Sequence, residues 1–144
     1  MGTLAISSFG TLLKKGDGGT SENFATIAEV LDIEGPELGL DTEESTSHDS
    51  AGGWEDLVGT ILRSGEIGFE INYVPTNATQ NAATGLIADM KNRTKRNFQL
   101  VFPNVSNTTW SFAALVTKFK PKAPVAGKLT ADVTLKLSGQ PTLA

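Results

Sequence analysis

Two stretches of the chain alternate apolar and polar residues with the period of two that is typical of half-buried strands. In residues 66–73 every second residue from Ile67 onward is apolar, and in residues 129–138 every second residue from Leu129 onward is apolar. The residues between them are mostly acidic, hydroxyl-bearing or otherwise polar. Both stretches are therefore predicted to cover a core with one face and to present a polar face outward.

Three further stretches are rich in β-branched and aromatic residues and also predict strands. They are residues 24–34, which end at Gly35-Pro36, residues 98–102, which end before Pro103, and residues 108–119. Proline and glycine at these ends are typical strand terminators. Together with the two alternating stretches, they predict five or more strands.

One segment changes to a helical period. Ala83, Leu86, Ile87 and Met90 form a single apolar stripe, which predicts a helix over residues 77–93. Residues 54–62 also place apolar side chains at helical spacing, and we expect a short helix or turn there. The pattern as a whole predicts a mainly β protein, a β-sandwich or open barrel of antiparallel strands with one flanking helix.

Residues 39–54 have almost no apolar side chains and predict a long, exposed, unstructured loop. Loops of that length are uncommon in compact domains and usually have a function. At 144 residues and 15.2 kDa the chain has room for a single domain, residues 1–144.

Charge is distributed unevenly along the chain. Residues 1–75 contain 14 acidic and three basic residues, whereas residues 76–144 contain two acidic and nine basic residues. If this separation persists in space, acidic and basic surfaces favour head-to-tail contact between copies. The acidic loop and the basic end of the predicted helix are the two candidate surfaces.

The residues predict no catalytic, metal or cofactor site. The chain has no cysteine, which excludes disulfides and thiolate chemistry. The only histidine, His48, lies among acidic residues and serines that are its neighbours in sequence, whereas a catalytic triad is assembled from separate segments. No apolar stretch approaches the roughly 20 residues of a membrane span, so no membrane anchoring is expected.

Four segments in order resemble the tail tube protein (major tail protein) of long-tailed bacteriophages. They are residues 6–13, 40–50, 91–103 and 127–139, and they span nearly the whole chain. The resemblance implies a structural virion protein, not an enzyme. Six copies form a ring by joining their sheets into one continuous inner barrel, and the rings stack into the hollow tail tube. The resemblance also implies that an N-terminal arm, residues 1–13, and the loop, residues 40–54, reach adjacent subunits or rings. It also implies assembly in the host cytoplasm, a tape-measure protein in the channel, contact with tail terminator and tail tip proteins, and passage of viral DNA.

A conduit for DNA should bind phosphate weakly, and lysine and arginine add affinity for phosphate. We therefore expect the polar strand faces, with their carboxylates and hydroxyls, to line the channel, although Lys136 departs from a purely acidic wall. The predicted channel-facing residues are Glu66, Glu70, Asn72, Thr130, Asp132 and Thr134. The predicted contacts between subunits or rings are Leu40, Asp41, Glu43, Glu44, His48 and Asp49 in the loop and Lys91, Arg93, Lys95 and Arg96 after the helix.

Other functions remain open from the residues. A tail terminator or completion protein would form a single ring without polymerising, and a tube subunit of a contractile secretion system would share the fold. A β-sandwich module could bind a ligand through Trp54 and Trp110. A hydrolase built around His48 is a further alternative.

Overall fold

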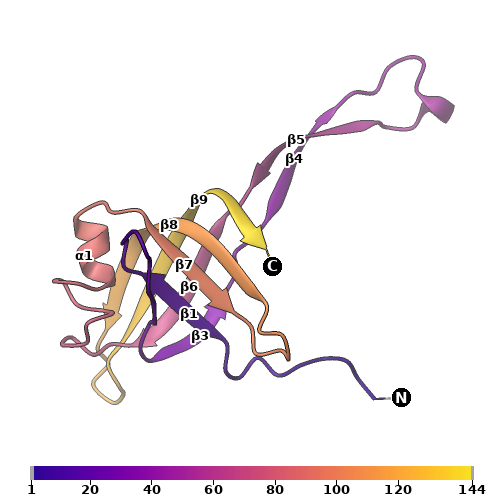
Figure 1. The fold of residues 1–144 in the computed structure, drawn as a ribbon. Coiled ribbons are helices and arrows are strands. Elements are labelled where there is room, and N and C mark those ends of the chain that lie inside the picture. The colour runs from indigo at the N-terminus through magenta and orange to yellow at the C-terminus, as the bar shows by residue number, and fades with distance from the viewer. Residues whose placement is uncertain (1, 144) are drawn as a thin grey trace.

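The computed structural model describes residues 2–143 and is built almost entirely from antiparallel strands, with one short α-helix (Figure 1). The predicted mainly β fold class is confirmed. The elements are β1 (Leu12–Gly16), β2 (Phe24–Thr26), β3 (Val30–Glu34), β4 (Gly39–Glu44), a 3-10 turn (Ala51–Gly53), β5 (Leu57–Arg63), β6 (Glu66–Asn72), α1 (Leu86–Lys91), β7 (Arg96–Val101), β8 (Thr109–Lys122) and β9 (Thr130–Leu143).

Seven strands form one sheet in the order β2-β1-β7-β8-β9-β6-β3. The strands at its two edges, β2 and β3, are consecutive in the chain, so the sheet curls until its edges come close together. The residues that link β2 to β3 form hydrogen bonds with a strand near each edge of the sheet. Ile27 N donates to Leu13 O of β1 over 2.9 Å, and Glu29 O accepts from Asn72 N of β6 over 2.9 Å. Of the two predicted architectures, the body is therefore the open barrel.

The single strand predicted over residues 24–34 is divided into β2 and β3. Glu29 lies between them with a φ of 59°, a left-handed conformation that ends a regular strand. This corner allows consecutive strands to occupy opposite edges of the sheet. Sequence periodicity missed it because glutamate carries no signal for positive φ.

The core is one cluster on the concave side of the sheet. The alternating residues of β6 and β9 are buried as predicted, from Ile67 to Ile71 and from Ala131 to Leu137, and they pack against Phe98 and Phe112. Leu129 is an exception, because it precedes β9 and is 38% exposed. Burying an aliphatic or aromatic side chain stabilises the fold by about 1.5–3 kcal/mol, so this cluster is its main support.

The helix is much shorter than predicted, because α1 has six residues and turns occupy most of residues 75–85. Side chains there bind the backbone in place of helical hydrogen bonds. Asn77 Oδ1 accepts from Thr79 N over 2.9 Å, and Asn81 Oδ1 accepts from Thr84 N over 2.8 Å. The apolar stripe was correct in placing Leu86 in the core, but the asparagines shorten the helix.

Strands β4 and β5 form a separate two-stranded sheet that projects from the body (Figure 1). The prediction of an unstructured loop over residues 39–54 is therefore wrong for Gly39–Glu44, and that of a helix or turn over residues 54–62 is wrong for β5. Both faces of this hairpin are exposed, so no core requires an apolar residue at every second position of β5. The apolar residues of β5 therefore do not show the period of two that is typical of a half-buried strand.

Candidate self-assembly surfaces

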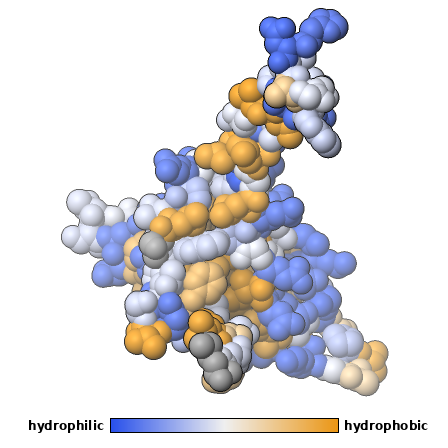
Figure 2. Space-filling view, turned by 90° about the vertical axis from the view of Figure 1, so that its right-hand side faces the viewer, coloured by the Kyte–Doolittle hydropathy of each residue, from blue (hydrophilic) through white to orange (hydrophobic). Residues whose placement is uncertain are grey.

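The hairpin exposes large apolar side chains along its stem. Leu40, Leu57, Val58, Ile61 and Leu62 are each at least half exposed, and Leu62 reaches 80%. Figure 2 shows these apolar residues over the stem and hydrophilic residues at its far end. A two-stranded hairpin alone in water is marginally stable, and exposed apolar side chains of this kind are typical of interaction sites.

The far end of the hairpin, residues 45–56, is ordered by its own hydrogen bonds. Asp56 O accepts from Ser45 N over 2.8 Å, Asp56 N donates to Thr46 Oγ1 over 2.8 Å, and Ser50 Oγ donates to Asp56 Oδ2 over 2.7 Å. This segment forms its own network of hydrogen bonds within one subunit.

The predicted contact residues of the hairpin are mostly exposed. Glu43, Glu44, His48 and Asp49 extend into solvent, whereas Asp41 is half-buried against its neighbouring strand. Asp41 Oδ2 accepts from Arg63 Nε over 2.8 Å, and this bond together with the negative charge raises the pKa of Arg63 above its ordinary value. The surface residues of the hairpin carry an excess of negative charge.

The basic residues after α1 separate into two groups. Lys91, Arg93 and Lys95 are exposed. Arg96 points inward: its Nε donates to Asp89 Oδ1 over 3.0 Å and its Nη1 donates to Asp17 O over 2.8 Å. The prediction of Arg96 as an intersubunit contact conflicts with this internal pairing, which the helix-end position in the sequence did not indicate.

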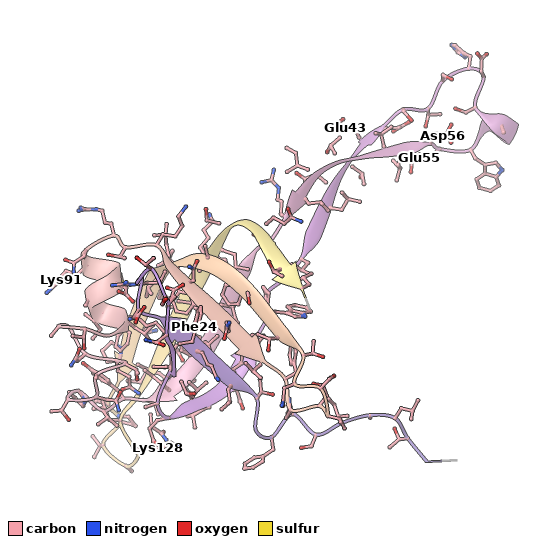
Figure 3. All side chains as sticks on the ribbon, viewed as in Figure 1. Phe24, Glu43, Glu55, Asp56, Lys91 and Lys128 are labelled. Atoms are coloured by element: carbon pink, nitrogen blue, oxygen red, sulfur yellow. The ribbon has the colours of Figure 1, made fainter. Side chains whose placement is uncertain are left out.

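Acidic and basic surfaces lie at opposite ends of the subunit. In Figure 3, Glu43, Glu55 and Asp56 lie on the projecting hairpin, and Lys91 and Lys128 lie on the far side of the body. The hairpin is therefore acidic and the far side of the body carries lysines, whereas the two halves of the chain interleave within the sheet. Stacked copies could place the acidic end of one against the basic end of the next.

Four strand segments carry a second, polar surface, which we call the polar wall. It is the outward face of β3, β6, β9 and residues 115–122 of β8. Glu66, Glu70, Asn72, Asp132 and Thr134 lie on it, as the alternation of β6 and β9 predicts. Thr130 shares this register but is only 8% exposed, so it is a poor candidate for lining a channel.

The wall also carries lysines that sequence analysis missed. Thr117 forms a β-bulge that shifts the register of β8 against β9, and it places Lys118, Lys120 and Lys122 opposite Thr134, Asp132 and Thr130. Periodicity cannot locate a bulge of one residue. With Lys136, the wall has four lysines and five carboxylates, Asp32, Glu34, Glu66, Glu70 and Asp132, a formal charge of −1.

One of these lysines is paired inside the subunit. Lys122 Nζ lies 2.6 Å from Glu70 Oε2 and 3.3 Å from Asp132 Oδ1. The hydrogen bond to Glu70, supported by Asp132, raises the pKa of Lys122, so its positive charge is retained at neutral pH. Across residues 2–143, Lys118, Lys120, Asp32 and Glu34 take part in no ion pair.

The described residues contain no cluster of three or more histidine or acidic side chains placed to hold a metal ion. No helix within residues 2–143 has the length and apolar character of a membrane span. Trp54 is exposed at the hairpin end, whereas Trp110 packs edge-on against Phe102 with ring centroids 5.5 Å apart. The two tryptophans therefore do not form one ligand platform.

Comparison with known families identifies the fold. Residues 13–144 match the family model of the lambda phage tail tube protein. The chain belongs to this tail tube protein family. It is a structural component of a tube, and the projecting apolar hairpin and polar wall are surfaces of a tube subunit.

Solved structures agree with this family. The tail tube fold superposes on a chain in the tail of an empty GTA particle, refined with C6 symmetry, with a TM-score of 0.71 and 20% identity over 92% of this chain and 95% of that one. A chain of the native gene transfer agent virion gives 0.76 with 16% identity over 97% and 99%. A chain of an extracellular contractile injection system sheath-tube complex gives 0.67 with 14% identity over 98% and 93%.

A search of curated protein sequences found no significant match to this chain.

Proposed function

We propose that this tail tube protein forms rings of six copies that stack into the hollow tube of a phage-like tail. The observation that carries the proposal is the exposed apolar stem of the β4–β5 hairpin on a subunit of this family. Six copies are inferred from the C6 symmetry of the similar GTA tail. A repeated heterologous contact closes into such a ring when the rotation between neighbours returns to its start.

In this proposal the hairpin connects successive rings. Its apolar stem is covered by a neighbouring subunit, and its acidic end approaches Lys91, Arg93 and Lys95 of another copy. Burial of the stem stabilises the contact, since apolar area contributes about 25 cal/mol per Å² removed from water. The opposite charges at the two ends select head-to-tail over head-to-head stacking.

We place the polar wall on the channel side. Glu66, Glu70, Asn72, Asp132 and Thr134 then line the bore, and their carboxylates and polar groups offer little affinity for phosphate. In this arrangement the tape-measure protein occupies the channel during assembly, and viral DNA passes through it later. A formal charge of −1 per wall is compatible with weak binding of either occupant.

The remaining partners follow from the same assembly. A terminator closes one end of the tube and tail tip proteins close the other, with assembly in the host cytoplasm and the finished tube in the virion. The protein acts by assembly and not by catalysis. Substitution of His48 by alanine should therefore abolish no enzymatic turnover, because the protein catalyses no reaction.

Electron microscopy of negatively stained, concentrated protein tests this function. We expect tubes of variable length with sixfold end views. Single rings that never stack would instead indicate a terminator, and a protein that stays monomeric at high concentration would contradict self-assembly and favour a binding module. Light scattering of the same samples measures how much protein is in polymer.

A further inference from the structure

The far end of the hairpin carries an exposed tryptophan beside acidic residues. Trp54 is 78% exposed and directly precedes Glu55 and Asp56. Tryptophan is on average highly buried in folded proteins, and it is among the residues most enriched at the centres of protein interfaces. Most of the apolar surface of this indole is therefore available to another molecule.

Two glycines fix the place of the indole. Gly52 and Gly53 of the 3-10 turn have φ of 63° and 74°, which favour glycine, and Trp54 N donates to Ala51 O over 3.3 Å. A Cβ atom on Gly52 would lie 3.0 Å from Trp54 Cδ1, so a side chain there would crowd the indole. The tryptophan is thus positioned before any contact forms, which lowers the entropy cost of binding.

The helix α1, in the body of the subunit, ends on an arginine at a position that glycine usually occupies. Arg93 N donates to Met90 O over 3.2 Å, and Thr94 N donates to Asp89 O over 2.9 Å. These two bonds form a Schellman motif, in which the residue at the position of Arg93 is left-handed. Arg93 has a φ of 55°, a conformation that is less favourable for a residue with a Cβ atom than for glycine.

The fold of the subunit does not explain an arginine at this position. Among residues 2–143, the other non-glycine residues with positive φ are Glu29, whose carboxylate accepts from Asn72 Nδ2, and Asn107, a residue type that tolerates this conformation. Arg93 is exposed, and within the same residues its guanidinium takes part in no ion pair. Backbone strain of this kind clusters at functional sites.

We propose that, where rings stack, Trp54 of one copy packs against the guanidinium of Arg93 of a copy in the next ring as a cation–π contact. This inference rests on the proposed stacking and names a pair of residues that joins the two ends. Trp54 is next to Glu55 in the chain, and Arg93 is two residues after Lys91. Figure 3 shows Glu55 and Lys91 at opposite ends of the subunit, which head-to-tail stacking brings together.

The chemistry of the two side chains favours this pair. Tryptophan has the ring that binds cations most strongly, and arginine is its more frequent partner because the guanidinium is planar and weakly hydrated. Glu55 and Asp56 attract the cation, and the indole supplies the surface on which it stacks. Lys91 and Lys95 carry compact, strongly hydrated ammonium groups, so they pair with carboxylates of the hairpin.

Two substitutions test the contact without damaging the subunit. Arg93→Gly removes the guanidinium and relaxes the backbone, so the monomer should withstand at least as much urea as the unaltered protein. Trp54→Leu keeps an apolar side chain and every charge of the hairpin. Each variant should raise the protein concentration at which tubes form by about tenfold, because a cation–π contact is lost. A residue that serves only the fold would not combine undiminished stability with weaker assembly.

Trp54→Leu/Arg93→Gly shows whether the two residues contact each other. The double variant should need about the same concentration as either single variant, because the second substitution removes a partner that is already lost. Independent roles would instead multiply to about a hundredfold. Lys91→Ala is the control for charge, and its effect should multiply with that of Trp54→Leu. Asn107→Gly relaxes another exposed residue with positive φ and should leave assembly unchanged.

Light scattering measures the concentration at which tubes form, and urea unfolding followed by circular dichroism measures the stability of each monomer. Normal assembly of either single variant, or a double variant whose effect is the product of the two, would overturn the Trp54–Arg93 contact and leave tube formation intact. If the unaltered protein forms no tubes, the proposed function itself fails, which is a separate result.

Discussion

Asp89 of α1 forms ion pairs with two basic side chains from the strands. It is 3% exposed, and the side chains of Lys15 and Arg96 reach it from β1 and β7. Lys15, itself 9% exposed, lies with its Nζ 3.1 Å from Asp89 Oδ2 and also donates to Thr84 O over 3.2 Å. These groups fix α1 against the strands. The sequence placed Arg96 in a surface cluster because nothing local marks its distant partner.

Replacing Asp89 with alanine should destabilise the subunit by about 3–5 kcal/mol, because Lys15 and Arg96 would remain largely buried without a carboxylate. The measurement is denaturant unfolding of the monomer. Asp41→Ala is the matched control, since it removes a carboxylate from an exposed ion pair with Arg63 and should change stability little. Equal losses in the two variants would argue against a structural role for the Asp89 cluster.

Gln80 shows how a buried amide can replace regular structure. It is fully buried, its Oε1 accepts from Val74 N over 2.7 Å, and its Nε2 donates to Ala28 O over 2.8 Å. These bonds hold the turns after β6 against the corner between β2 and β3. Gln80 and the neighbouring asparagines explain why the segment with the clearest helical stripe contains only a short helix.

At the scale of elements, the β4–β5 hairpin differs most from a self-sufficient structure. It has apolar residues on exposed strands and no core of its own. Another chain would be needed to remove its apolar area from water. Under the proposed function, the hairpin is the element through which one subunit joins its neighbours.

Ile61→Ser/Leu62→Ser should leave the stability of the monomer within about 0.5 kcal/mol of its original value, because both side chains are exposed in the subunit. Tube formation should be lost or greatly reduced. Unfolding curves and light scattering measure the two effects. Val105→Ser, at a fully exposed valine in the turn before β8, should alter neither, and tubes formed normally by the hairpin variant would contradict its role in stacking.

At the scale of the whole molecule, a net charge of −4 conceals an acidic end and a basic end. This polarity gives the subunit a direction, and a direction is required for rings that stack head to tail. The polar wall lies between the two ends and is nearly balanced in charge. Under the proposed function, the positions of the charges, and not the net value, would orient the stacking of rings.

Tube formation should slow as salt rises, because the Debye length falls from about 10 Å at 0.1 M to about 3 Å at 1 M. Lys91→Glu/Lys95→Glu should slow stacking at low salt, and its difference from the unaltered protein should shrink at 1 M. Time-resolved light scattering measures both rates. A rate that is constant or increases with salt in the unaltered protein would indicate that apolar burial alone drives stacking.

The sequence by itself determined the strand-rich class, the inward faces of β6 and β9, and the absence of cysteine chemistry. These properties depend on local periodicity and composition. It also carried the family resemblance. Its predictions were wrong where an element has no core to impose a period, as in β4 and β5, and where local hydrogen bonds replace a helix, as in residues 75–85.

Only the tertiary structure decided which surfaces are available to other copies. Closure of the sheet at Glu29, the bulge at Thr117 and the burial of Asp89 each depend on contacts between residues far apart in the chain. The bulge turns three lysines onto the wall, and the short β7 leaves an edge of β8 open. Periodicity in the sequence predicts neither the bulge nor the open edge, because the partner strand, and not the strand itself, determines where the pairing of two strands ends.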